Sequence, residues 1–372
     1  MRIDEAKARE LLDRVGRDVE EGILPSCQVA LGFEGEVAEF EAFGAATPDT
    51  RYHVFSATKP FVAAAMWLLI GDGDVDVARP VTEYVPEFGT NGKDVVTVEQ
   101  VMLHTSGFPQ APLGHPQWAT REGRRAAFAK WRLNWEPGTR YEYHPTSAHW
   151  VLADIIERVT GRDYRDVIQE RVTAPAGLAR RVLGVPADQQ DRIAMLEPRG
   201  EPATPDELEA AIGIRELPVT EVTEEALLNF NTPAVRAVGV PGGGAIMTAA
   251  DLARFYQVLL HDPVGIWKPD VLADATGGVR NRLPDPVFRV PANRTLGLVR
   301  AGDDGLAHFR GLGRTVSARA FGHNGAGGQL AWADPETGLS LGYVTNGLDA
   351  HVLRQNRRGV AIASRAALCA TP

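Results

Sequence analysis

Cysteine is scarce in this chain of 372 residues, and its two copies, Cys27 and Cys369, lie near opposite ends. A disulfide framework is therefore improbable, and no C-x-x-C motif suggests zinc or redox chemistry. The histidines are not accompanied by carboxylates in a metal-ligand pattern. We predict that the protein uses neither a metal nor another cofactor.

Long apolar runs are also lacking. No run reaches the about 18 residues that a membrane-spanning helix requires. The N-terminus, MRIDEAKARELLDRVGRDVEEG, is charged throughout and carries Leu11, Val15 and Val19 at helical spacing. This pattern predicts an amphipathic helix and not a signal peptide. We therefore expect no membrane span and a cytoplasmic enzyme.

Basic residues are fewer than acidic ones, and the formal net charge is −9. A nucleic-acid partner would require a basic patch, so we expect a small-molecule partner and no nucleic acid. Most basic residues are arginine, and lysine occurs only at positions 7, 59, 93, 130 and 268. A lysine close to a candidate nucleophile is therefore more informative in this chain than in most. The oligomeric state is left open.

Strand-like segments lie at the two ends of the chain. Residues 27–33 and 36–44 are joined by Glu34-Gly35, which predicts a β-hairpin. From about 57 to 290 the periodicity is mostly helical, and Thr248 with Asp251 predicts a capping box at the start of one helix. Beyond 295 the pattern predicts further strands, including 305–310, and then a closing helix over roughly 351–368.

This arrangement predicts an α+β fold. One antiparallel sheet is built from both termini and flanked by helices, and a mainly helical region is inserted between them. The predicted boundaries are 1–56 with 291–372 for the sheet domain and 57–290 for the helical domain. The active site is expected between the two. The segment 185–240, rich in Pro and Glu, is left as either a lid or a surface excursion.

An S-x-x-K motif, Ser56-Ala57-Thr58-Lys59, supplies a candidate nucleophile. A serine hydroxyl is a weak nucleophile unless a neighbouring base takes its proton. At the start of a helix, residues i and i+3 share one face, so the Lys59 amine can reach the Ser56 hydroxyl. Pro60 is tolerated only in the first helical turn, which places Ser56 at the mouth of the helix. Chance supplies this motif fairly often, and a helix-capping serine beside a solvated lysine would look the same.

Further segments occur in a fixed order after it: VTVEQVMLHTSGFP, then PGTRYEYHPTSAHW with Tyr143, then GVPGGGAIMTAADLARF, and GHNGAGG at 322–328. With them the chain resembles the β-lactamase-like serine hydrolases over about residues 20–365. This group includes class C β-lactamases, D-alanyl-D-alanine peptidases and S-x-x-K carboxylesterases. The resemblance implies the α/β sandwich of the β-lactamase and transpeptidase fold.

The resemblance also implies roles for single residues. Ser56 matches the acylated serine, Lys59 the lysine one helical turn after it, and Tyr143 the tyrosine that shuttles protons. His323-Asn324-Gly325 matches the third motif, which contacts the substrate. The oxyanion hole would be formed by the backbone N–H groups of Ser56 and Ala326. His144, next to Tyr143, could line the substrate pocket. Whether Lys59 or Tyr143 is the base in each step is not decided by the sequence.

Two departures from the family pattern bear on the substrate. Pro145 stands where the second motif has an asparagine whose amide contacts the acylamino group of lactams and peptides. His323 replaces the lysine that β-lactamases direct at the substrate carboxylate, and histidine is largely neutral near pH 7. Both changes favour an esterase acting on small or uncharged acyl esters, of the EC 3.1.1 class. The alternatives are a β-lactamase, D-Ala peptidase, amidase or acyltransferase, or an inactive binding protein of the same fold.

Three other features invite functional roles. Gly338-Leu339-Ser340-Leu341-Gly342 fits the G-x-S-x-G elbow of α/β-hydrolases, but no helix follows it, so we interpret Ser340 as a strand serine. His104 is expected to form structural hydrogen bonds. Gly242 to Gly244 lack the context of a phosphate loop, and we expect them to let the backbone pass close to the cleft or to another segment.

Overall fold

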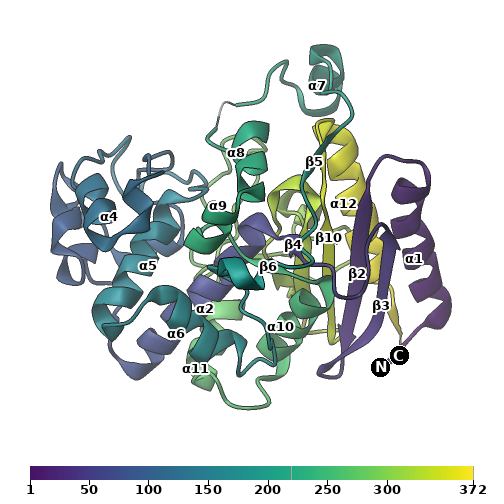
Figure 1. The fold of residues 1–372 in the computed structure, drawn as a ribbon, viewed down its shortest axis with the longest axis horizontal. Coiled ribbons are helices and arrows are strands. Elements are labelled where there is room, and N and C mark those ends of the chain that lie inside the picture. Colours follow the sequence, from purple (N-terminus) through teal and green to yellow (C-terminus); the bar gives the residue numbers. More distant parts are fainter. Residues whose placement is uncertain (219, 372) are drawn as a thin grey trace.

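The computed structural model describes residues 1–218 and 220–371. Most of the helices lie, in sequence, between the N-terminal strands and the C-terminal strands of the main sheet (Figure 1). The strands are β1 (Arg2–Ile3), β2 (Ser26–Phe33), β3 (Glu36–Gly44), β4 (Tyr52–His53), β5 (Glu197–Arg199), β6 (Ile246–Met247), β7 (Val299–Arg300), β8 (Phe321–Gly322), β9 (Leu330–Asp334), β10 (Leu339–Thr345), β11 (Gly347–Asp349) and β12 (Ala370–Thr371). The α-helices are α1 (Glu5–Glu20), α2 (Lys59–Asp72), α3 (Val98–Met102), α4 (Arg121–Phe128), α5 (Ser147–Thr160), α6 (Tyr164–Ile168), α7 (Pro205–Ile212), α8 (Glu224–Leu228), α9 (Pro233–Val238), α10 (Ala249–His261), α11 (Pro269–Gly277) and α12 (Val352–Ala366).

The main sheet has six strands in the order β3-β2-β10-β9-β8-β7, and every neighbouring pair is antiparallel. Two of these strands come from the N-terminal end of the chain and four from the C-terminal end. The hairpin between β2 and β3 turns at Glu34 and Gly35, whose φ angles of 51° and 85° are those of a type I′ turn. The α+β class and the hairpin predicted from the sequence are confirmed.

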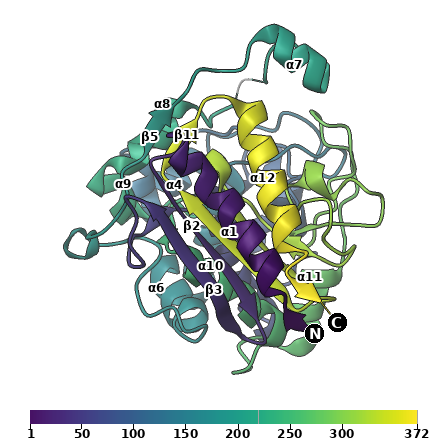
Figure 2. The same ribbon diagram turned by 90° about the vertical axis from the view of Figure 1, so that its right-hand side faces the viewer.

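Helices cover both faces of this sheet. The long helices α1 and α12 pack against each other and lie side by side across one face, as Figure 2 shows. On the other face α10 packs against β2, β9 and β10. Its N-terminus has the predicted capping box, since the Thr248 side chain accepts from Asp251 N and the Asp251 side chain accepts from Thr248 N. Two hydrophobic clusters, one on each face, follow from this layering.

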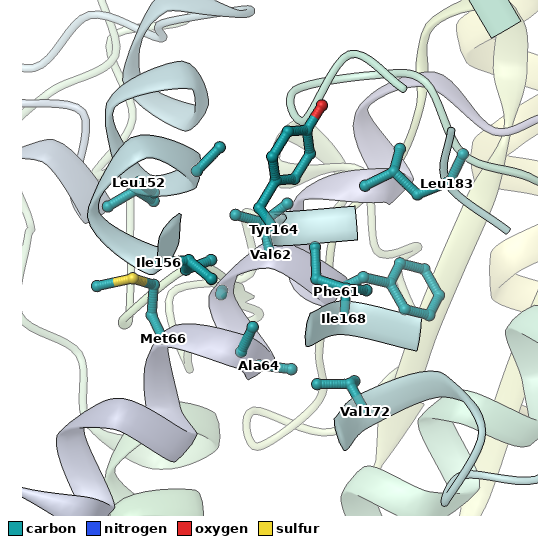
Figure 3. Close-up of a cluster of buried hydrophobic side chains, with 14 of the residues drawn as sticks. Phe61, Val62, Ala64, Met66, Leu152, Ile156, Tyr164, Ile168, Val172 and Leu183 are labelled. Carbon is teal, nitrogen blue, oxygen red and sulfur yellow. The ribbon is translucent and has the colours of Figure 1, made fainter. Parts of the chain in front are cut away.

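The central helix of the helical region is α2, which is apolar on all sides. Its residues from Lys59 to Leu69 are buried, and α5 and α6 pack against it. Figure 3 shows Met66 of α2 beside Ile156 of α5, and Phe61 of α2 beside Ile168 of α6. A helix that is hydrophobic all round has to be surrounded by protein. The start of α2 is therefore held firmly inside the molecule.

Some predicted strands are shorter or absent. Residues 305–310 were expected to form a strand but contain a 3₁₀ turn, Ala307–Arg310. The turn is enclosed by Gly305 and Gly311, whose φ angles of 73° and 83° cannot belong to a strand. The closing helix α12 forms as predicted despite Gly359. Among the described residues, no helix is long and apolar enough to cross a membrane.

Candidate active site

Ser56 lies in a 3₁₀ turn, Phe55–Thr58, that runs directly into α2. Phe55 has φ of 45°, a left-handed conformation that a bulky residue avoids. Its ring packs edge-on against Phe230 and stacks near His53, and this packing holds the strained turn. Strain of this kind costs about 1–3 kcal/mol and concentrates at functional sites. The half-buried Ser56 is thereby presented at the start of a buried helix.

The Lys59 amine lies 3.2 Å from the Ser56 hydroxyl oxygen, so the predicted i, i+3 approach is present. Two backbone carbonyls, those of Pro145 and Gly242, accept hydrogen bonds from the same amine at 2.6 and 2.7 Å. No carboxylate pairs with Lys59 among the described residues. The amine is therefore fixed by neutral acceptors, beside a serine, in the interior of the protein.

Burial lowers the pKa of Lys59 well below the ordinary value of 10.5, and the nearby Arg294 guanidinium lowers it further. Glu221 acts weakly in the opposite direction. Taking an ammonium group out of water disfavours its charged form, and a second cation adds to that effect. The amine can therefore lose its proton at a pH at which an exposed lysine keeps it.

Gly242 brings one of the two carbonyls to this amine. A Cβ atom at position 242 would lie 2.6 Å from the Pro145 carbonyl oxygen and 2.9 Å from the Thr146 Cα. A larger residue would therefore separate the segment around 242 from the segment around 145, and with it the two acceptors of Lys59. The prediction that the Gly242–Gly244 run allows a close backbone approach is confirmed at this residue.

Tyr143 lies over the Lys59 amine, which is 4.9 Å from the centre of its ring. Its hydroxyl oxygen is buried and has no hydrogen-bond partner among the described residues. Burial raises the pKa of this phenol, while Arg294 and the nearby Ser56 side chain act weakly against the shift. Tyr143 is therefore a neutral phenol with a free hydroxyl beside the lysine and the serine.

The two predicted oxyanion donors are available. Neither Ser56 N nor Ala326 N donates a hydrogen bond to another described residue, and both residues line the same cavity. Gly325 allows this approach, because a Cβ atom there would overlap the carbonyl oxygen of Val54, two residues before the serine. Free N–H groups of this kind stabilise the negative charge that develops on a carbonyl oxygen under attack.

His323 is buried, and its ring centre lies 5.9 Å from that of Tyr143. Its Nδ1 is 2.9 Å from the Asn324 carbonyl oxygen, whereas Nε2 has no partner among the described residues. Burial, Arg294 and Lys59 lower the pKa of His323 well below 6.5. The ring is therefore neutral and offers a substrate no positive charge.

The structure does not support substrate contacts from the side chains of Asn324 and His144. The Asn324 amide donates to the Gly311 carbonyl, and its oxygen accepts from Ala331 N. His144 is fully buried, with Nδ1 bonded to the Glu142 carbonyl and Nε2 accepting from Phe108 N. Each of these side chains stabilises the backbone behind the site.

Arg294 was not identified from the sequence. Its guanidinium lies 5.3 Å from the centre of the Tyr143 ring and donates to the Tyr141 hydroxyl at 2.9 Å. It follows Asn293, which has a strained φ of 45°. The segment that carries it, PANRTLGLVR, has no motif, so only the folded structure shows that this arginine approaches Lys59 and Tyr143.

A small cavity of about 190 Å³ opens beside Ser56 and Ala326. Most of its lining is apolar, including Phe55, Trp118 and Phe230, with Glu221 as an exception. The volume is below the about 300–1,000 Å³ of pockets that hold drug-sized ligands. Part of the wall comes from the segment 221–230, so this part of the irregular 185–240 stretch covers the cavity.

The remaining candidates have structural surroundings. Ser340 is fully buried in β10, where its hydroxyl donates to the Ala253 carbonyl at 2.8 Å. His104 accepts from His144 N and packs its ring 4.8 Å from that of Tyr143, so it supports the tyrosine from behind. Within residues 1–218 and 220–371, no group of three or more metal-ligating side chains is found.

Comparisons with known proteins agree with this geometry. A model of the beta-lactamase family matches residues 11–364. Over 321 residues the chain is 30% identical to the esterase/beta-lactamase LipL of Mycobacterium tuberculosis, covering 81% of this chain and 70% of LipL. It is 28% identical to the esterase EstB of Burkholderia gladioli, over 64% of each protein.

A solved structure supports the same placement. The penicillin-binding protein homologue of Caulobacter crescentus superposes with a TM-score of 0.79 at 25% sequence identity, over 98% of both chains. The family model spans almost the whole chain, and the sheet, the inserted helices and the buried lysine beside a serine are consistent with it. The chain therefore belongs to the beta-lactamase family of serine hydrolases and has the fold of that family.

Proposed function

We propose that this protein is a carboxylesterase that cleaves esters of small carboxylic acids through an acyl-enzyme on Ser56. Lys59 acts as the base in acylation, and Tyr143 protonates the departing alcohol. The oxyanion is held by the N–H groups of Ser56 and Ala326. His323 and the backbone around Gly325 form one wall beside the substrate.

The contacts of the Lys59 amine carry this proposal. A neutral amine has two N–H groups and one lone pair. The carbonyls of Pro145 and Gly242 accept two hydrogen bonds from Lys59, and the lone pair is then left to the Ser56 hydroxyl at 3.2 Å. Two fixed acceptors thus orient the base toward the nucleophile, and its lowered pKa leaves it unprotonated more often.

Acylation follows from this arrangement. The Ser56 oxygen attacks the ester carbonyl carbon while its proton passes to Lys59 Nζ. The carbonyl oxygen becomes an oxyanion beside the two free N–H groups. The bond from carbon to the alcohol oxygen then breaks, and that oxygen takes the phenolic proton of Tyr143. The proton on Lys59 returns to Tyr143, which leaves the acyl-enzyme and a neutral amine.

Deacylation repeats these steps with water as the nucleophile. The same amine, through the phenol, removes a proton from the attacking water, and the released Ser56 oxygen is reprotonated. The acid that is formed leaves the cavity. The raised pKa of Tyr143 suits a group that donates a proton and recovers it within each half-reaction.

Esters are favoured over lactams because the groups that would recognise a lactam are missing. Pro145 has no side-chain amide, and its carbonyl is already bonded to Lys59. His323 is neutral and buried, and so supplies no cation for a carboxylate. Lactam hydrolysis is the second candidate function, because LipL, the relative with 30% identity, is named both esterase and beta-lactamase.

Steady-state assays with p-nitrophenyl butyrate and a chromogenic cephalosporin test the proposal. We expect kcat/KM for the ester to exceed that for the lactam by at least about 100-fold, which corresponds to about 2.7 kcal/mol of transition-state stabilisation. Intact-mass analysis after treatment with an activated phosphonate should show one adduct, located on Ser56 by peptide mapping. A preference for the lactam would overturn the esterase assignment, and the absence of any adduct would favour an inactive binding protein.

A further inference from the structure

Glu221 is the one ionisable side chain among the described residues that line the cavity beside Ser56. Its carboxylate oxygen Oε1 accepts two hydrogen bonds from Thr146, from the backbone N at 3.0 Å and from the hydroxyl at 2.8 Å. The second oxygen, Oε2, receives no hydrogen bond from any described residue. The carboxylate is therefore held at one oxygen and open at the other.

The position of this carboxylate relative to the reacting groups follows from the chain. Thr146 is the residue after Pro145, and the Pro145 carbonyl accepts from Lys59 at 2.6 Å. Glu221 is thus fixed one residue away from an acceptor of the candidate base. No lysine or arginine forms an ion pair with Glu221 in the described part of the chain, while Arg294 is bonded to Tyr141. Burial raises the pKa of this carboxyl above 4.5, while the hydrogen bonds from Thr146 and the nearby Lys59 act against the shift.

The acyl part of an ester is the part that should meet this charge. In the proposed mechanism the alcohol oxygen leaves beside the hydroxyl of Tyr143. Tyr143 is not among the residues that line the cavity, whereas Ser56, Ala326 and Glu221 are. With the alcohol on the Tyr143 side of the serine, the acyl group extends into the cavity toward Glu221.

We propose that Glu221 selects substrates by charge, so that the enzyme prefers short acyl groups that end in an ammonium group and discriminates against acyl groups that end in a carboxylate. This inference rests on the proposed esterase function. A carboxylate in a mostly apolar cavity attracts a cation and repels an anion more strongly than it would in water. Neutral acyl groups of the same size fall between the two.

The test compares three methyl esters with acyl groups of similar length: methyl 3-aminopropanoate, methyl butanoate and monomethyl malonate, assayed near pH 7.5 by methanol release. We expect wild-type kcat/KM for the cationic ester to exceed that for the anionic ester by at least about tenfold. Glu221→Gln keeps an oxygen acceptor for Thr146 but removes the charge, and should reduce this ratio at least about fivefold.

Two further variants separate charge from structure. Thr146→Val removes the hydrogen bond from the Thr146 hydroxyl to Glu221 but keeps the carboxylate. It should change kcat/KM for all three esters by a similar factor. Glu225→Gln removes one charge from an exposed position of α8 and should leave the ratio as in the wild type. If Glu221→Gln also changed kcat/KM for all three esters by the same factor, Glu221 would only hold Thr146 in position, and the inference would be overturned.

The remaining outcomes distinguish this inference from the proposed function. An enzyme that cleaves methyl butanoate but accepts the cationic and anionic esters equally well overturns the charge selection and leaves the esterase assignment intact. An enzyme that cleaves none of the three esters, nor p-nitrophenyl butyrate, overturns both.

Discussion

Ser56 and Ser340 both lie in motifs that known hydrolases use for a nucleophile, but the groups around their hydroxyls differ in kind. Ser56 has an amine at 3.2 Å, a neighbouring phenol and a cavity on one side. Ser340 is enclosed between β10 and α10, where it donates to the Ala253 carbonyl and accepts from the Gln257 amide at 3.1 Å. A backbone carbonyl in a helix cannot take a proton. The surroundings, and not the motif, make one serine a candidate nucleophile and the other a strand residue.

Removing the Ser56 hydroxyl should have the largest effect on activity. Ser56→Ala leaves no oxygen to form the acyl-enzyme, so kcat/KM for p-nitrophenyl butyrate should fall by at least about 10⁴-fold. The measurement is steady-state hydrolysis with circular dichroism and thermal unfolding as checks on folding. A folded Ser56→Ala variant with wild-type turnover would mean that catalysis occurs elsewhere in the molecule.

Removing the base should cost somewhat less. Lys59→Met keeps most of the length of the side chain but has no amine to accept a proton, and kcat should fall by about 10³-fold. Two carbonyls, those of Pro145 and Gly242, lose their donor, so urea unfolding must accompany the assay to show that the variant is folded. Retention of most of the activity would assign the base to another group.

The pH profile of the wild type gives an independent check on Lys59. A base works only when unprotonated, and burial together with Arg294 lowers the pKa of Lys59. The ascending limb of kcat/KM against pH should therefore lie well below pH 10.5, the ordinary value for lysine. An ascending limb near that ordinary value would contradict the role of a buried, partly unprotonated amine.

Tyr143→Phe should produce a smaller loss that depends on the leaving group. The phenol is proposed to protonate the departing alcohol, a step that contributes about 10²-fold for a poor leaving group. Nitrophenolate leaves readily without a proton, so the loss should be about 100-fold for ethyl butyrate and much less for p-nitrophenyl butyrate. Equal losses on the two esters would indicate that Tyr143 only positions other groups.

Most of the secondary-structure elements around these two serines could be predicted from the sequence. The hairpin at Glu34-Gly35, the capping box at Thr248 and the start of α2 near Pro60 all depend on residues within a few positions of one another. Local rules apply to such features because the interacting groups are neighbours in the chain. The strand expected at 305–310 failed for a local reason as well, since its two bounding glycines adopt positive φ angles.

The parts of the site that could not be predicted depend on long-range packing. Arg294 reaches the Tyr143 ring from 151 positions away in the chain, and Glu221 reaches Thr146 from 75 positions away. Neither residue lies in a recognisable motif. His144 was expected at the substrate because it follows Tyr143, but its ring nitrogens are both bonded inside the protein. Adjacency in sequence shows that a side chain is near a site, and not that it faces the substrate.

The region around Ser56 should also be more sensitive to acid than the region around Ser340. His53 precedes the serine turn and His144 supports the Tyr143 loop, and burial lowers the pKa of each to about 3. Unfolding returns each pKa to about 6.5, so the unfolded chain binds more protons between these values. These two histidines do not lower the free energy of unfolding above about pH 6.5. As the pH falls from there toward 3, each histidine lowers it by about 1.4 kcal/mol per pH unit.

Urea unfolding at pH 7 and pH 5 measures this slope. Replacing His53 with Phe, which matches its aromatic contacts with Phe55 and Phe230, should change the pH response. The decrease in the free energy of unfolding from pH 7 to pH 5 should be smaller by about 2 kcal/mol. The exposed His261 replaced with Gln is the matched control and should leave the slope unchanged. An unaltered slope in the His53 variant would show that this buried ring does not govern the acid response.

Ser340→Ala should have the smallest effect, and it tests the other half of the comparison. The substitution removes two hydrogen bonds, the one that Ser340 donates to the Ala253 carbonyl and the one that it accepts from the Gln257 amide, while Gln257 keeps its bond to the Gly338 carbonyl at 3.0 Å. Two lost neutral hydrogen bonds cost about 2 kcal/mol, and in a protein of this size that lowers Tm by only several degrees. Ester hydrolysis should stay within about twofold of the wild type, because the stability change is small compared with the stability of a folded domain. A large loss of activity at normal stability would show that the β10 serine takes part in catalysis after all, since no packing change on the sheet could then account for it.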